Sequence, residues 1–106
     1  MRRFAIYSGT TLVGWSDLEG VDHSMATAYG VLTVADGYAR IRDKAISLRG
    51  INQSELGLSV RLSTGESLRC DFVNIADHSD EVAVDGIEVS SHGISDPAVH
   101  VLFPVS

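Results

Sequence analysis

The sequence has little cysteine, no long hydrophobic run and few aromatic residues, and these shortages exclude several classes of protein. Cys70 is the only cysteine among 106 residues, so the chain makes no internal disulfide and no cysteine-based metal site. The first apolar run, residues 4–7, is shorter than the roughly 7–15 residues of a secretory signal. No stretch approaches the ~18 apolar residues that span a membrane. We therefore expect a soluble, cytoplasmic protein that does not contact membranes.

Positive charge is scarce in the second half of the chain. Residues 50–106 hold nine of the fourteen acidic residues but only two of the eight basic ones, a net charge of −7, whereas residues 1–49 carry +1. Six carboxylates and no cation lie between Asp71 and Glu88. Such a surface repels nucleic-acid phosphates, which supply most of the affinity for DNA and RNA. It favours a basic protein partner instead, because complementary charge speeds association.

The strand pattern predicts a mainly β protein. A length of 106 residues with 44% hydrophobic residues suits one domain, residues 1–106. Apolar and polar residues alternate over residues 58–62 and 68–72 on either side of a Gly65 turn, which predicts a hairpin with Phe72 on its core face. Further strands are expected in these ranges: 3–7, 11–15, 28–34 (buried on both faces, or on one), 82–84, 87–89 and 98–105.

One segment departs from the strand pattern. Residues 36–43 lack alternation, and the three-residue spacing of Tyr38 and Ile41 predicts a short helix that sets both side chains against the sheet. Short strands separated by glycine-rich turns are typical of antiparallel folds. The sequence therefore predicts a compact single-domain antiparallel β-sandwich or small barrel with one short helix near residues 36–43.

A set of residues between positions 4 and 41 carries a resemblance. Its members are Phe4, Tyr7, Leu12, Val13, Gly14, Ser16, Leu18, Glu19, Asp22, Met25, Gly30, Tyr38 and Ile41. In this spacing the chain resembles a group of small, uncharacterised bacterial proteins with no known activity. The resemblance implies a bacterial source and a shared small fold, and it supplies no cofactor or catalytic residue.

The tripeptide Asp-His-Ser occurs twice, at residues 22–24 and 77–79. If the fold brought the two copies together, Asp22, His23, Asp77 and His78 would offer nitrogen and oxygen ligands to a divalent metal. Alternatively, an aspartate could orient a histidine that activates Ser24 or Ser79. The interpretation we favour is structural, because Asp and Ser stabilise turns by bonding nearby backbone amides.

Three functional hypotheses follow. The favoured one is a non-catalytic protein-binding module without a cofactor, such as an acidic inhibitor or immunity-type protein that binds a basic partner. Its binding patch would consist of Asp77, Asp80, Glu81, Asp85 and Glu88. The alternatives are a small metal-dependent hydrolase built on the two Asp-His-Ser segments, and a structural component that forms oligomers. The chain is expected to be a monomer, or a homodimer formed through an edge strand such as residues 98–105.

Overall fold

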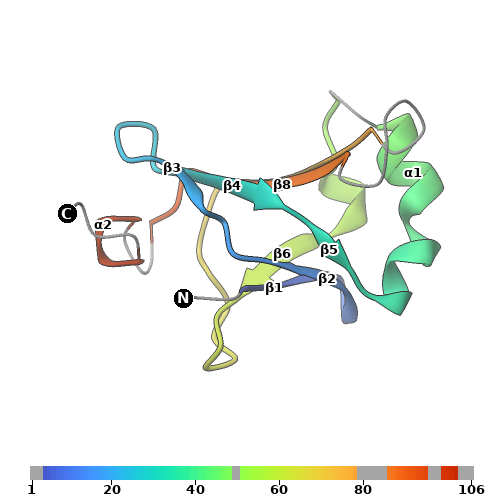
Figure 1. Ribbon diagram of the computed structural model, residues 1–106, viewed down its shortest axis with the longest axis horizontal. Coiled ribbons are helices and arrows are strands. Elements are labelled where there is room, and N and C mark those ends of the chain that lie inside the picture. Colours follow the sequence, from blue (N-terminus) through green and yellow to red (C-terminus); the bar gives the residue numbers. More distant parts are fainter. Residues whose placement is uncertain (1–3, 49–50, 79–85, 96–98, 103–106) are drawn as a thin grey trace.

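Two antiparallel sheets of four strands each form the protein. The structure is a computed structural model that describes residues 4–48, 51–78, 86–95 and 99–102. The first sheet has the order β5-β2-β1-β6 and the second the order β3-β4-β8-β7. The strands are β1 (Phe4–Ser8), β2 (Thr11–Ser16), β3 (Gly20–Asp22), β4 (Thr27–Val31), β5 (Thr33–Val34), β6 (Leu58–Arg61), β7 (Phe72–Asp77) and β8 (Ile87–His92). The sheets lie in two layers (Figure 1), which confirms the sandwich and not the closed barrel.

The core lies between the two layers. Alternate residues of each strand point inward, as the period of a β-strand requires. The buried apolar residues of the strands are Phe4, Ile6, Val13 and Val60 in the first sheet and Ala28, Val73, Ile75 and Val89 in the second. The hairpin of β1 and β2 forms where the sequence predicted it, with Gly9 at a positive φ of 59° in the turn.

The apolar run over residues 28–34 is two strands and not one. β4 belongs to the second sheet and β5 to the first, and the chain changes sheets at the buried residue Leu32. Within β4, Ala28 and Gly30 are buried while Tyr29 and Val31 are exposed, so only one face of this strand is covered. The strand is therefore buried on one face, the second of the two forms that the sequence left open.

The predicted helix near residues 36–43 is present and longer than expected. It consists of a 3-10 turn, η1 (Asp36–Arg40), followed by α1 (Arg42–Ser47). Tyr38 is buried and Ile41 half-buried, as their spacing predicted. The segment lies at one end of the sandwich, where α1 contacts β7 (Figure 1).

The hairpin predicted over residues 58–72 is only partly formed. β6 is a strand, but its return is reduced to a bridge between Arg61 and Ser67 and a hydrogen bond from the Leu68 amide to the Val60 carbonyl. The chain then crosses to the second sheet as β7, so Phe72 begins a strand that pairs with β8. Its side chain is 55% exposed, and its expected place in the core was wrong.

The C-terminal run is helical where the structure describes it. Residues 98–105 were predicted as a strand, but Val99–Leu102 forms the short helix α2, at the opposite end of the sandwich from α1 (Figure 1). Within it, Leu102 is buried and Val101 is exposed. A short apolar run does not distinguish helix from strand by periodicity alone. Of the other predicted strands, 87–89 lies within β8 and is confirmed, whereas 82–84 falls outside the described residues.

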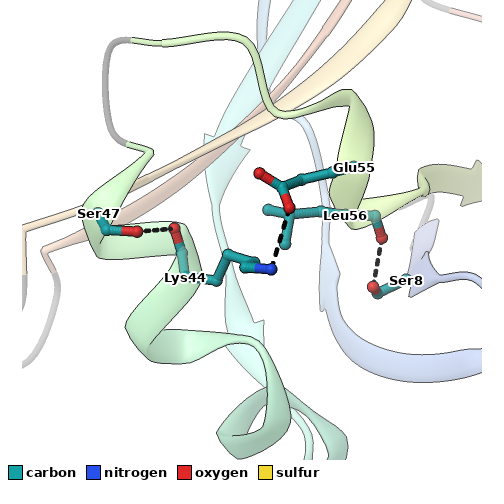
Figure 2. A network of polar contacts seen from close by, with 5 residues as sticks. All are labelled: Ser8, Lys44, Ser47, Glu55 and Leu56. Carbon is teal, nitrogen blue, oxygen red and sulfur yellow. Dashed lines mark hydrogen bonds and ion pairs between the residues drawn. The ribbon is translucent and has the colours of Figure 1, made fainter.

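A short 3-10 helix, η2 (Ser54–Leu56), joins the helical end to the sheets. The Lys44 ammonium lies 3.0 Å from the Glu55 carboxylate, and this ion pair links α1 to η2 (Figure 2). The Ser8 hydroxyl at the end of β1 donates a hydrogen bond to the Leu56 carbonyl, and Ser47 donates to the carbonyl of Lys44. Both members of the ion pair are more than half exposed, so this pair contributes little to stability.

The buried side chain of Gln53 ties this region to β7. Its amide nitrogen donates to the Ile75 carbonyl and its oxygen accepts from the Ile75 amide, each at 2.7 Å. Gln53 thereby forms with the edge of β7 the pair of hydrogen bonds that a neighbouring strand would form. Among the described residues, no helix is long and apolar enough to cross a membrane.

Candidate functional site

The outer face of the second sheet exposes large apolar side chains. Its inward positions are filled by the core, so the alternate residues of β4, β7 and β8 point away from the first sheet. Tyr29 is 43% exposed, Val31 49% and Phe72 55%. We call this surface the open face and define it by Tyr29, Val31, Phe72, Glu88 and His92. Tyr29 and Val31 lie on β4 and Phe72 on β7, on the same face with β8 between them. Exposed apolar surface of this kind is the feature by which interaction sites on soluble proteins are recognised.

Strand pairing fixes the positions of these side chains. Val31 pairs with Glu88, and Phe72 pairs with His92. The rings of Phe72 and His92 stack with their centroids 4.4 Å apart and their planes inclined by 13°. His92 Nε2 lies 2.9 Å from the hydroxyl of Ser90, which holds the imidazole in place. The aromatic part of the open face is thus ordered before any partner arrives.

The position of the Tyr29 ring requires a glycine at residue 20. Tyr29 pairs with Gly20 on β3, and a Cβ built at Gly20 would lie 2.3 Å from the tyrosine ring. The absence of a side chain therefore allows the ring to lie across the edge strand. The ring packs against the backbone of Gly20, while nearly half of the Tyr29 side chain stays exposed.

The charges near the open face are negative. Glu88 is exposed between Val31 and Ala76, and Asp22 lies at the corner of the sheet on β3. The strands of the second sheet contain no lysine or arginine. The face combines exposed apolar and aromatic side chains with one carboxylate among them, Glu88, and another at its corner, Asp22.

A groove adjoins the open face at the β7 edge. It has a volume of about 720 Å³ and runs between β7 and the segment before β6, with Ile51, Asn52, Leu58, Asp71 and Phe72 among its lining residues. Ile51 is 60% exposed. Phe72 belongs to both surfaces, so the open face and the groove are continuous.

Asp77 was predicted to belong to a surface patch, and the structure places it in the interior. The side chain has no exposed surface, and the Tyr38 hydroxyl donates a hydrogen bond of 2.5 Å to its Oδ2. Burial, and then the hydrogen bond and charge of Asp77, raise the pKa of the Tyr38 hydroxyl well above its ordinary value. The buried carboxyl therefore anchors the helical segment to the end of β7 and offers nothing to a partner at the surface.

The other members of the predicted patch divide into two groups. Glu88 is exposed and belongs to the open face. Asp80, Glu81 and Asp85 lie outside the described residues.

The two Asp-His-Ser segments do not converge. Asp22 pairs with Thr27 at one end of the second sheet, and Asp77 pairs with Ile87 at the other end. With strands about 4.8 Å apart and a rise of about 3.3 Å per residue, the two aspartates lie about 20 Å from each other. In the ranges that the structure describes, no three His, Cys, Asp or Glu side chains are grouped to hold a metal ion. The four predicted ligands therefore do not form one site.

The first of these segments is a turn. The amide and hydroxyl of Ser24 and the amide of Met25 all donate to Oδ1 of Asp22, at 2.7–3.2 Å. These bonds, with the Ser24 hydroxyl the strongest, lower the pKa of the Asp22 carboxyl. Because Ser24 donates to the aspartate and not to a histidine, the geometry is that of an Asx turn, as the structural interpretation predicted.

No protein-family model matches the chain, and no curated protein or solved structure is significantly similar to it. The open face is therefore interpreted from its own geometry. Sequence reasoning found Glu88 but missed Val31, Phe72 and His92. The alternation of Ala28 and Gly30 with Tyr29 and Val31 contained the signal, since small residues inside and large residues outside indicate an exposed face.

Proposed function

We propose that the protein is a non-catalytic protein-binding module that binds a partner through the open face. The observation that carries this proposal is the exposure of Tyr29, Val31 and Phe72 on one surface of a well-packed sheet. Aromatic side chains dominate the binding energy of protein interfaces, and they do so best when they are held rigidly. The stack of Phe72 on His92 and the contact of Tyr29 with Gly20 supply that rigidity.

The partner that fits this face combines apolar groups with basic side chains. Glu88 lies on the open face and Asp22 at its corner, and no cation of the second sheet neutralises them. Lysine or arginine side chains of a partner would face these carboxylates, and the chain's net charge of −6 would steer such a partner toward it. An inhibitor or immunity-type protein that covers a basic enzyme is the form of this function that we favour.

Self-association through the same surface is disfavoured by charge. A face-to-face pair of identical chains would bring two copies of Glu88 and of Asp22 into one interface. Like charges opposed across an interface cost binding energy. The open face is therefore better suited to a different protein than to a second copy of this one.

Two exposed valines provide a matched test. Val31 on the open face is 49% exposed, and Val34 on β5 of the first sheet is 46% exposed. We expect Val31→Lys to weaken capture of the partner from host extract at least about tenfold, because a lysine there removes an apolar contact and repels a basic partner. Val34→Lys adds the same charge elsewhere and should leave capture unchanged.

A second pair of measurements tests the role of charge. Glu88→Gln should reduce the association rate and its dependence on salt while leaving the unfolding midpoint unchanged, as expected for an exposed carboxylate that attracts a basic partner. Equal capture by the wild type, Val31→Lys and Glu88→Gln would show that the open face is not the binding surface.

A further inference from the structure

A second surface, on the outside of the first sheet, places an arginine beside two aromatic rings. Ala5 of β1 pairs with Arg61 of β6 on one side and with Trp15 of β2 on the other. Since Phe4 and Ile6 point into the core, Ala5 and its neighbours Trp15 and Arg61 point outward. They line a pocket of about 430 Å³ together with Tyr7, Leu62 and Ser63.

The positive charge of Arg61 is not neutralised by the residues that the structure describes. The carbon of its guanidinium group lies 4.2 Å from the centroid of the Tyr7 ring, a cation–π contact. Its Nε is buried and has no hydrogen-bond partner there, as expected where the guanidinium lies against a ring. Lys44 pairs with Glu55, whereas Arg61 forms no ion pair with the described residues.

The dimensions of the pocket and the one cation among its described lining residues, Arg61, indicate the class of ligand. The small side chain of Ala5 leaves room for a flat apolar group against the aromatic side chains of Trp15 and Tyr7. The guanidinium group matches the planar geometry of a carboxylate. One cation among the described lining residues suits a monoanion, whereas a dianionic phosphate would require further positive groups. We propose that this pocket binds a small carboxylate attached to a flat apolar group, a function separate from that of the open face.

Tryptophan fluorescence tests the proposal directly, because Trp15 is the only tryptophan in the chain. Titration of the full chain with phenylacetate should change Trp15 emission to saturation, with a Kd in the millimolar range expected for a ligand of this size. Phenylacetamide has the same shape without the charge, and it should bind at least about tenfold more weakly. Inorganic phosphate should compete poorly.

Three variants locate the site. Arg61→Gln should bind phenylacetate about tenfold more weakly and no longer distinguish it from phenylacetamide. Arg69→Gln removes the other cation of the second half of the chain, which is exposed and outside the pocket, and should bind like the wild type. Ala5→Val fills the space at Ala5, so it should weaken the binding of both phenylacetate and phenylacetamide. Because this variant keeps Arg61, it tests the site even if Arg61→Gln does not fold.

The proposal is overturned by any of three results. These are a titration of the wild type that shows no saturable change, equal affinities for phenylacetate and phenylacetamide, and a folded Arg61→Gln that binds phenylacetate as tightly as Arg69→Gln does. Phosphate that binds as tightly as phenylacetate would overturn the choice of a carboxylate.

Discussion

Removal of the Tyr38 hydroxyl should destabilise the protein markedly. In Tyr38→Phe the ring keeps its packing, but the buried carboxyl of Asp77 loses the hydrogen bond that Tyr38 donates to Oδ2. Asp77 has no exposed surface and Tyr38 is 4% exposed, so water does not readily replace the lost donor. A buried polar group that loses a hydrogen bond costs about 1–3 kcal/mol. For a domain of this size, a loss of about 2 kcal/mol lowers the Tm by about 8 °C or more.

The assay is thermal and urea unfolding of Tyr38→Phe beside Tyr29→Phe. Tyr29 undergoes the same chemical change, but its side chain is 43% exposed on the open face, so its substitution should stay within about 0.5 kcal/mol of the wild type. The combination of Tyr38→Phe with Asp77→Asn measures the coupling between the two side chains, which should exceed about 0.5 kcal/mol. Equal stability of Tyr38→Phe and Tyr29→Phe would refute the structural role assigned to the buried pair.

Two further predictions concern stability. Because the pKa of Tyr38 is raised above its ordinary value of 10.0, its contribution is complete below about pH 10 and is lost at higher pH, where the unfolded state ionises first. The unfolding free energy of the wild type should therefore fall more steeply above about pH 10 than that of Tyr38→Phe, and parallel curves would contradict this. Gln53→Met should cost about 2 kcal/mol in urea unfolding and speed amide exchange at Ile75, because both hydrogen bonds to the Ile75 backbone are lost. A cost below about 0.5 kcal/mol, with unchanged exchange, would show that the Gln53 amide is dispensable.

The sequence predicted best those elements whose partners are near in the chain. The hairpin of β1 and β2 and the helical segment containing Tyr38 depend on turn residues and on spacings of three or four positions. The first Asp-His-Ser segment was also interpreted correctly, because Asp22 bonds to amides only two and three residues away. All the residues that determine such local structures lie within a few positions of each other in the sequence.

The errors arose where the partner is distant. Leu68, Cys70 and Phe72 alternate like a strand facing the core, yet Phe72 pairs with His92 in the other sheet and points outward. Asp77 was expected in solvent because isolated carboxylates rarely tolerate burial. Its partner Tyr38 is 39 residues away, and nothing in the local sequence indicates that the two will meet. The open face was missed for the same reason, since which side of a strand is covered depends on where the second layer lies.

The side-chain pairing of Gln53 has a consequence for how the molecule behaves in a crowded solution. An uncovered outer strand is a template on which further chains can add, and growth of this kind ends in fibres. On β7, the Gln53 amide forms hydrogen bonds with the Ile75 backbone that an added strand would need. On β6, the following segment pairs with the strand through the Arg61–Ser67 bridge and the hydrogen bond from the Leu68 amide to the Val60 carbonyl. These two strands, which contact each other, are thereby protected from open-ended polymerisation. At these two edges the fold itself limits the addition of further strands.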